Sequence, residues 1–329
     1  MKDLIQQFPK HIIDSLELGA HIRFKPHRKQ IRNIVIAGLG GSGIGGKIVA
    51  DILKDRCDIP VLVTNDYDVP KFVNKRTLFV ACSYSGNTEE TISAIGQAIK
   101  QDAEVTVLTS GGFLERIAIE KDLNHIMIPG GLPPRSAFGL SSVAIFYILY
   151  KYVLIKGFFI SDLEKSAQFL LDHQQEIMDN AKGLASLIKD SIPVIYADAK
   201  YEGVAIRLRQ QINENSKMLC WHHVFPEMNH NELVGWAGGT KDYSVLLFRT
   251  ADMHERTSIR MDLSKDVFSK YTDKVYEIEA KGETQLQRAY YLIHFGDWLS
   301  WYLSEEKNVD AVEVNVIDHL KSELAKHED

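Results

Sequence analysis

Residues 34–47 of the chain read Ile34-Val35-Ile36-Ala37-Gly38-Leu39-Gly40-Gly41-Ser42-Gly43-Ile44-Gly45-Gly46-Lys47. A short apolar run passes into a glycine-rich loop, and a segment of helical composition follows. Glycine permits backbone angles that let amide N–H groups turn toward a ligand, and the start of a helix presents the positive end of its dipole. The stretch therefore predicts a parallel strand whose carboxyl end opens onto an anion site, with phosphate as the expected anion.

Three kinds of phosphate site fit this loop, and spacing separates them. Gly38, Gly40 and Gly43 satisfy the dinucleotide fingerprint, which is weak evidence when it stands alone. Residues 41–47 also have the spacing of a nucleotide triphosphate loop, but Ile48 stands where a Ser or Thr would hold magnesium. That departure argues against a nucleotide triphosphatase and leaves a dinucleotide or a phosphate monoester.

A second loop, residues 82–91, follows the apolar run 78–81 and favours the monoester. Three hydroxyl side chains stand just before a predicted helix, and hydroxyls with amides at a helix start suit a compact phosphate that accepts several hydrogen bonds. Helix capping by Ser85 or Thr88 is the plainer alternative, but it accounts for one hydroxyl and not for all three. The predicted phosphate-binding residues are Gly41, Ser42, Ser83, Ser85 and Thr88.

These two loops carry a resemblance. Gly-Gly-Ser-Gly at 40–43 and Ser-x-Ser-Gly-Asn-Thr-x-Glu-Thr at 83–91 resemble the sugar isomerase (SIS) domain of enzymes and regulators that bind phosphosugars. Asn-Glu-Asn-Ser-Lys at 213–217 and Asn-His-Asn-Glu at 229–232 make the chain similar to the bifunctional phosphoglucose/phosphomannose isomerase family. The resemblance runs from Gly38 to Lys321, and it implies an α/β fold of two SIS-type, doubly wound parallel-sheet subdomains, each with three α/β/α layers.

Composition agrees with a globular protein of two domains. The chain has 329 residues, 45% hydrophobic and 25% charged, which suits two domains of about 150 residues. Its net charge of −6, without a basic stripe, offers no electrostatic case for nucleic acid. Cys57, Cys82 and Cys220 are too few and too scattered for a disulfide framework or a zinc motif, and the N-terminus lacks a secretory apolar core. A cytoplasmic location is expected.

From residue 34 onward, apolar strands alternate with helical patterns, which predicts right-handed crossovers and parallel sheets covered on both faces. The predicted strands are 34–37, 61–64, 78–82, 105–109 and 125–128 in the first half, and 193–197, 219–223, 243–248 and 275–278 in the second. The expected domains are 1–157, which holds the phosphate loops, and 158–329. Residues 142–160 are the most apolar part, but two lysines interrupt them, so a buried helix is expected rather than a membrane span. A helical linker over 161–190 follows.

Two residues are candidates for the chemistry at the reacting carbons. Arg135 lies in a Gly- and Pro-rich loop and, taken alone, is most simply a surface arginine in a turn; the resemblance implies that it faces the reacting carbons and stabilises a negatively charged intermediate. Glu214 lies on a predicted helix, 205–217, where helical offsets gather it with Arg207, Gln210 and Gln211; the plainer alternative is a solvated face with Glu214 paired to Lys217. The resemblance places the catalytic base at Glu214.

The segment 221–232 contains His222, His223 and His230 beside two acids, but its spacing matches no compact metal motif, so no metal site is expected. His222 and His223 are expected in a strand. The resemblance implies that His230 opens the sugar ring from the neighbouring subunit, which makes a homodimer part of the site, and that Lys321 on a terminal helix assists.

Together these features predict a homodimeric aldose–ketose isomerase that needs neither metal nor cofactor and acts on hexose 6-phosphates. It is expected to interconvert glucose 6-phosphate, and mannose 6-phosphate, with fructose 6-phosphate through an enediolate. Two other classes stay open: a non-catalytic phosphosugar-binding protein, and a nicotinamide-dependent dehydrogenase that would explain the first loop but not the second.

Overall fold

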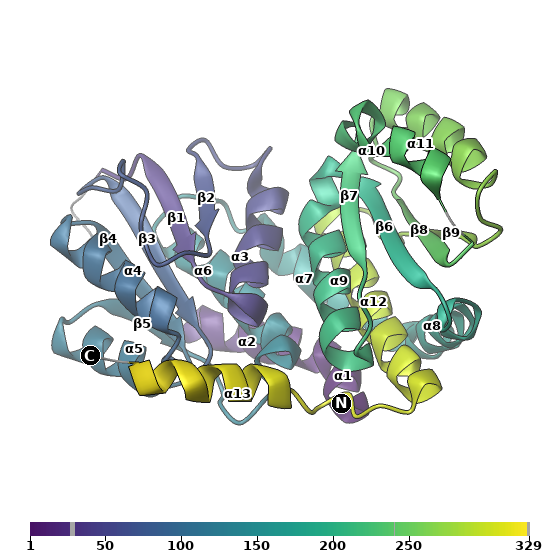
Figure 1. Ribbon diagram of the computed structural model, residues 1–329. Coiled ribbons are helices and arrows are strands. Elements are labelled where there is room, and N and C mark those ends of the chain that lie inside the picture. Colours follow the sequence, from purple (N-terminus) through teal and green to yellow (C-terminus); the bar gives the residue numbers. More distant parts are fainter. Residues whose placement is uncertain (27–29, 240, 328–329) are drawn as a thin grey trace.

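Two parallel β-sheets, one from each half of the chain, lie side by side and are covered by helices (Figure 1). The computed structural model describes residues 1–26, 30–239 and 241–327. Within these residues the first sheet has the strand order β2-β1-β3-β4-β5 and the second has the order β7-β6-β8-β9. Every strand pair in both sheets is parallel, as the alternation of strands and helices predicts.

The strands are β1 (Asn33–Ala37), β2 (Val61–Thr64), β3 (Thr77–Ser83), β4 (Glu104–Thr109), β5 (Asn124–Met127), β6 (Ile192–Asp198), β7 (Trp221–Phe225), β8 (Tyr243–Arg249) and β9 (Val275–Glu279). The α-helices are α1 (Lys2–Gln6), α2 (Phe8–His21), α3 (Gly40–Leu53), α4 (Glu89–Lys100), α5 (Gly112–Glu120), α6 (Phe138–Lys151), α7 (Phe158–Asp172), α8 (Gln174–Ile188), α9 (Glu202–Ser216), α10 (Glu232–Gly235), α11 (Glu255–Phe268), α12 (Gln285–Lys307) and α13 (Asn315–Leu324). Short 3₁₀ helices are η1 (Pro134–Ala137), η2 (Ala199–Tyr201), η3 (Glu227–His230), η4 (Trp236–Gly238) and η5 (Ala325–His327).

The order of the first sheet places the two glycine-containing loops side by side. The chain leaves β1 toward β2 on one side and later returns to β3 on the other, so the direction of winding reverses between β1 and β3. In open parallel sheets, ligands bind in the crevice beyond the carboxyl ends of the strands at this reversal. The loops that follow β1 and β3 both lie there. Gly86, in the second loop, has φ +70° and packs against the backbone of Gly111, so a larger residue there is both strained and obstructed.

The sequence suggests that the strongly apolar stretch 142–160 is one buried helix. In the structure it contains most of α6, a turn and the start of α7. The break is a Schellman turn in which the Val153 N–H donates to the Tyr150 carbonyl and the Leu154 N–H donates to the Leu149 carbonyl. Val153 has φ +59°, in the left-handed region that such turns require. The predicted linker 161–190 is likewise two helices, α7 and α8. No helix in the described part of the chain is both long and apolar enough to cross a bilayer.

In the second sheet, one strand lies two residues later than predicted. The prediction was 219–223, whereas β7 spans Trp221–Phe225. Lys217 ends α9 in the left-handed conformation, and the next residues lead the chain away from the helix with Leu219 85% exposed, so pairing with β6 begins only at Trp221. His222 and His223 do lie in a strand, as expected.

Helix α9 joins the two halves. It packs on α12, and near its start the Gly203 N–H donates to the Asp51 carboxylate of α3 at 2.9 Å. Its 15 residues span about 22 Å. Because α9 begins beyond the carboxyl end of β6, its last turn lies at the opposite end of the second sheet, beside the loops of the first (Figure 1). The helix therefore carries its C-terminal residues to the predicted phosphate site.

Candidate active site

The two predicted phosphate loops form one hydrogen-bonded unit. The Ser83 and Thr88 hydroxyl oxygens are 2.7 Å apart, and the Gly86 N–H donates to Ser83 Oγ at 3.1 Å. The Tyr84 N–H donates to Ser42 Oγ at 3.0 Å, which ties the first loop to the second. Thr88 stands at the N-cap of α4 but makes no side-chain capping bond, so the capping alternative fails for this residue. Ser85 Oγ accepts from the Asn87 N–H at 3.2 Å and lies in the same turn.

Helix η1 packs directly against the first loop and carries Arg135. A Cβ atom on Gly41 would lie 2.9 Å from the Pro134 carbonyl carbon, so only glycine permits this approach. Arg135 is 5% exposed. Burial lowers the pKa of its guanidinium, while the neighbouring Glu214 and Asp310 carboxylates act in the opposite direction. The surface-turn alternative for Arg135 is therefore wrong.

The Arg135 guanidinium contacts residues from two distant parts of the chain. Its Nη1 is 3.2 Å from Glu214 Oε2, and its Nε donates to Asn215 Oδ1 at 2.8 Å. Its Nη2 donates to the carbonyls of Ala311 at 2.6 Å and Val312 at 3.1 Å. The arginine thus joins the last turn of α9 to the segment between α12 and α13.

The Glu214 side chain is 26% exposed and turns toward Arg135. The solvated-face alternative predicts that Lys217 pairs with the Glu214 carboxylate, and this pairing is not found. Lys217 Nζ instead donates to three carbonyl oxygens, those of Glu214 at 2.8 Å, Asp310 at 2.5 Å and Glu313 at 2.8 Å. Lys217 thereby satisfies one carbonyl at the end of α9 and two in the segment before α13, and it leaves the Glu214 carboxylate to Arg135.

A buried ion pair between Arg207 and Asp297 contacts the backbone of Arg135. Arg207 Nη2 donates to the Arg135 carbonyl at 3.1 Å and to Asp297 Oδ2 at 2.7 Å. Gln211 Nε2 donates to the other oxygen, Asp297 Oδ1, at 2.6 Å. All three side chains are almost fully buried. Of the residues that helical offsets grouped with Glu214, Arg207 and Gln211 do share a partner, Asp297, but Gln210 lines a different hollow, beside Leu39 and Gly40. Asp297 comes from α12 and gave no signal in the sequence.

Two hollows are lined by predicted site residues. One is a void of about 10 Å³, room for about one water molecule, between the two predicted phosphate loops and η1, and its lining includes Gly41, Ser42, Ser83, Pro134 and Ala137. The other, of about 240 Å³, is bordered by the end of α9 and the start of α13, and its lining includes Glu214, Lys217, Glu313, Val316 and Ile317. Pro134 and Ala137, which flank Arg135 in η1, line the first hollow, and Glu214, which contacts Arg135, lines the second.

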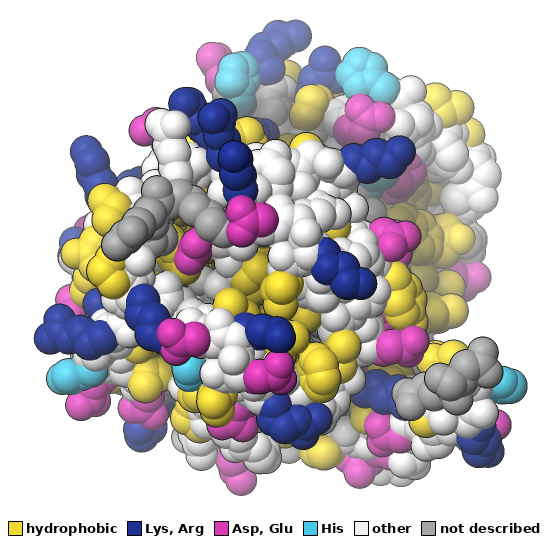
Figure 2. All heavy atoms as spheres, turned by 90° about the vertical axis from the view of Figure 1, so that its left-hand side faces the viewer, with side chains coloured by type: hydrophobic (Ala, Val, Ile, Leu, Met, Phe, Trp, Pro, Cys, Tyr) yellow, Lys and Arg dark blue, Asp and Glu magenta, His cyan; other side chains and the backbone are white. Residues whose placement is uncertain are grey.

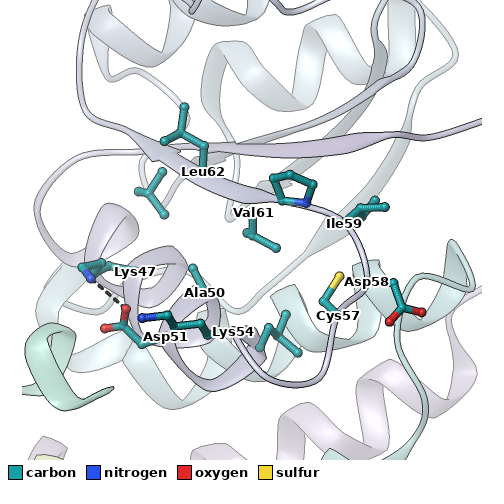
Figure 3. Close-up of a pocket in the computed structure, with 12 residues that line it drawn as sticks. Lys47, Ala50, Asp51, Lys54, Cys57, Asp58, Ile59, Val61 and Leu62 are labelled. Carbon is teal, nitrogen blue, oxygen red and sulfur yellow. Dashed lines mark hydrogen bonds and ion pairs between the residues drawn. The ribbon is translucent and has the colours of Figure 1, made fainter. Parts of the chain in front are cut away.

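A separate groove of about 630 Å³ lies between α3 and β2. Figure 3 shows Lys47 and Asp51 on one wall and Val61 and Leu62 on the other. Lys47 Nζ donates to Asp51 at 2.7 Å and is as close to Glu202, so this charge is already paired. None of the predicted site residues lines this groove.

His230 and Lys321 are not brought to Arg135 and Glu214 within the described chain. His230 ends η3 beyond the carboxyl end of β7, at the opposite end of α9 from Glu214, and it is exposed. Lys321 lies on α13 and, in the described residues, has no hydrogen bond or ion pair with either residue. Residues 1–26, 30–239 and 241–327 contain no group of three or more His, Cys, Asp or Glu side chains that is arranged to hold a metal ion.

Helix α13 lies along the first half of the chain in Figure 1, and none of its residues is buried. Its apolar side chains Val316, Ile317, Leu320 and Leu324 are all exposed. Figure 2 faces the left-hand side of Figure 1 and shows acidic, basic and apolar side chains interspersed over that face. The helix is held mainly through the segment that precedes it, by Arg135 and Lys217.

Comparison with known proteins places the chain among phosphosugar enzymes. It is 35% identical over 341 residues to the bifunctional phosphoglucose/phosphomannose isomerase of Caldicellulosiruptor bescii, with 100% of both chains covered. It is 38% identical over 299 residues to the protein of the same name from Thermoplasma acidophilum, with 89% of this chain and 90% of the relative covered. Residues 177–324 match the bacterial phospho-glucose isomerase C-terminal SIS domain.

Solved structures confirm the fold. The C-terminal domain of glucosamine-fructose-6-phosphate aminotransferase from Francisella tularensis superposes with a TM-score of 0.74, covering 94% of this chain and 97% of that one at 16% identity. Glucosamine-6-phosphate deaminase from Thermotoga maritima superposes with a TM-score of 0.69, covering 94% and 96% at 14% identity. The predicted arrangement of two parallel-sheet α/β units is thus shared with both.

Proposed function

Because the chain belongs to the bifunctional phosphoglucose/phosphomannose isomerase family, we propose that it interconverts glucose 6-phosphate and mannose 6-phosphate with fructose 6-phosphate. One observation supports this reaction most directly. The Glu214 carboxylate and the Arg135 guanidinium meet at 3.2 Å beside a loop unit rich in hydroxyls. A base, a cation and a phosphate cradle are the three parts that an aldose–ketose isomerase needs.

The phosphate end of the sugar binds at the two loops of the first sheet. Gly41 and Ser42 supply backbone and hydroxyl groups from one loop, and Ser83, Ser85 and Thr88 supply hydroxyls from the other. The phosphate takes no part in the reaction, so the energy of its binding serves to orient the carbons at the far end of the sugar.

The reaction moves a proton between C1 and C2. Glu214 takes the proton from one carbon and returns it to the other, since a single carboxylate that reaches both carbons suffices. The oxygen atoms of the resulting enediolate carry negative charge, which the Arg135 guanidinium stabilises at short range in a largely buried position. The buried Arg207–Asp297 pair holds the backbone of Arg135 in place.

Ring opening requires an acid, and His230 and Lys321 fill this role in the proposal. His230 lies at the other end of a helix about 22 Å long from Glu214, so it serves a neighbouring subunit in a homodimer rather than its own. Lys321 lies on α13, which follows the segment that Arg135 and Lys217 anchor. A cytoplasmic location completes the proposal, in keeping with the three unpaired cysteines Cys57, Cys82 and Cys220.

Mixed dimers test the shared site. Glu214→Gln and His230→Ala homodimers are each expected to be nearly inactive. Subunits of both kinds, mixed and re-associated, regain activity because one of the two sites then has a wild-type Glu214 and a wild-type partner His230. No recovery in dimers shown to be mixed would place His230 in the same site as its own Glu214.

The function itself is tested by offering glucose, mannose and fructose 6-phosphates separately to the purified protein in a coupled assay, with and without a chelator. Turnover of all three, unchanged by the chelator, is expected. Exchange of the C2 hydrogen of the substrate with water separates an isomerase from a phosphosugar-binding protein without catalysis, because only the isomerase exchanges it. Saturable binding of a nicotinamide dinucleotide would favour a dehydrogenase instead.

A further inference from the structure

Asn215 is completely buried at the end of α9, and both ends of its side-chain amide are used. Its Oδ1 accepts from Arg135 Nε at 2.8 Å, and its Nδ2 donates to Ser300 Oγ at 2.9 Å. The Ser300 hydroxyl donates its single hydrogen to the Asp297 carbonyl at 2.8 Å, so toward Asn215 it acts only as an acceptor. This direction forces the NH₂ of Asn215 toward Ser300 and its oxygen toward Arg135.

The contacts of Arg135 account for most of its hydrogen-bonding capacity. A guanidinium has five N–H groups in a rigid plane. Nε uses one on Asn215, Nη2 uses two on the carbonyls of Ala311 and Val312, and Nη1 uses one on Glu214. Among the described residues, this leaves one N–H without a protein acceptor, and it belongs to Nη1, the nitrogen that also meets Glu214.

We propose that Asn215 is a positioning residue that fixes the plane of the Arg135 guanidinium, so that the remaining Nη1 hydrogen points to the oxygen atoms on which charge develops beside Glu214. This inference rests on the proposed isomerase function. Without the Asn215 oxygen, the plane is held only by the two carbonyls at Nη2 and by the partly exposed Glu214. The guanidinium then turns about its long axis, and the free hydrogen leaves the reacting oxygens.

The chain offers a matched control next to Asn215. Ser216 is also buried and also bonds to residue 300, since its Oγ donates to the Ser300 carbonyl at 2.7 Å. Ser216 does not contact Arg135. Replacing either side chain removes a buried hydrogen bond between α9 and α12, but only one replacement frees the guanidinium. A residue that merely ties these helices together would give the same result at both positions.

The experiment compares Asn215→Ala, Asn215→Asp and Ser216→Ala in the full-length protein. For Asn215→Ala, kcat is expected to fall about 10- to 100-fold with KM within a factor of three, because a small displacement of a catalytic group affects the transition state more than the bound substrate. Ser216→Ala keeps the wild-type kcat. Asn215→Asp retains an oxygen acceptor for Nε. Its decrease in log kcat relative to wild type is expected to be no more than half of the decrease in Asn215→Ala. In an Arg135→Ala background, Asn215→Ala has no further effect on kcat.

Four results would overturn the proposal: a wild-type kcat in Asn215→Ala, an equal loss in Ser216→Ala, an Asn215→Asp variant as impaired as Asn215→Ala, or additive losses with Arg135→Ala. A second readout does not depend on activity. The Nε–Hε signal of Arg135, assigned by its loss in Arg135→Ala, is expected to exchange with water at least 10-fold faster in Asn215→Ala and unchanged in Ser216→Ala. A wild-type protein with no isomerase activity but with this exchange pattern refutes the function and supports the positioning; unchanged exchange in Asn215→Ala refutes the positioning.

Discussion

Replacing Glu214 by glutamine separates the role of its charge from the role of its shape. In the wild-type protein, Arg135 Nη1 is 3.2 Å from the Glu214 carboxylate. Glutamine keeps the length of the side chain and an oxygen that can accept from Nη1. It cannot take a proton from carbon. General base catalysis contributes about 10²- to 10⁴-fold, equivalent to about 3–5 kcal/mol of transition-state stabilisation. The variant is therefore expected to lose at least about 100-fold in kcat.

The cost to folding is far smaller. The Glu214 side chain is 26% exposed, and Arg135 keeps three other acceptors, on Asn215, Ala311 and Val312. Weakening one partly exposed contact costs about 1 kcal/mol, whereas domains are stable by about 5–15 kcal/mol. The folded fraction stays close to one, so unfolding cannot account for a large loss of kcat.

The assay pairs turnover with binding. Fructose 6-phosphate turnover is measured in a coupled assay, and binding of a hexitol 6-phosphate, which has no carbonyl and cannot isomerise, is measured by calorimetry. We expect turnover to collapse and the Kd to change by less than about threefold, because the phosphate loops are untouched. Glu313→Gln is the control, since Glu313 lines the same hollow and its side chain does not contact Arg135. Activity in Glu214→Gln equal to that of Glu313→Gln would remove Glu214 from the mechanism.

Three further changes test other parts of the structure. Ser83→Ala removes a hydroxyl that is hydrogen-bonded to Thr88 and accepts from the Gly86 N–H. Steady-state kinetics with fructose 6-phosphate are expected to show a loss of kcat/KM of at least about 10-fold. Inorganic phosphate is expected to inhibit the variant less strongly. Asp297→Ala leaves Arg207 as an uncompensated buried charge and is expected to lower the free energy of unfolding in urea by about 3–5 kcal/mol, whereas joint replacement of both residues by apolar ones costs less. Burial lowers the pKa of His294 from 6.5 to about 3. Below pH 6.5 this histidine therefore takes up a proton in the unfolded chain but not in the folded one. The free energy of unfolding has its full contribution from the neutral His294 above pH 6.5 and loses it as the pH falls toward 3. The slope attributable to His294 is at most about 1.4 kcal/mol per pH unit, and unfolding titrations of His294→Leu are expected to show a shallower profile.

The fold was predictable from the sequence because its signals are local. The strands β1, β2 and β3 each contain a short apolar run before a turn or a helix, and the two loop motifs lie within residues 38–46 and 83–91. The errors are also local in origin. Val153 ends α6 in a conformation that usually requires glycine, so composition gave no sign of the break.

The candidate site was predictable only in part. Motifs predicted candidates such as Arg135 and Glu214, but they gave no sign of the contacts that connect positions far apart, such as Arg135 with Ala311 and Arg207 with Asp297. No periodicity within one helix reveals a partner on another. The role of Asn215 was hidden for the same reason, since its neighbours Arg135 and Ser300 are separated from it by 80 and 85 positions.

The hydrogen bonds from Arg135 to the carbonyls of Ala311 and Val312 have a consequence for the order in which the protein folds during synthesis. The first sheet contains everything that its own strands pair with by residue 127, so it can form early during synthesis. The guanidinium, however, finds its acceptors 79 to 177 positions downstream. The strands of the first sheet and the loops that follow β1 and β3 are therefore synthesised long before Arg135 can meet its acceptors, and a chain that ends before residue 311 has these loops without the contacts that Arg135 makes with Ala311 and Val312.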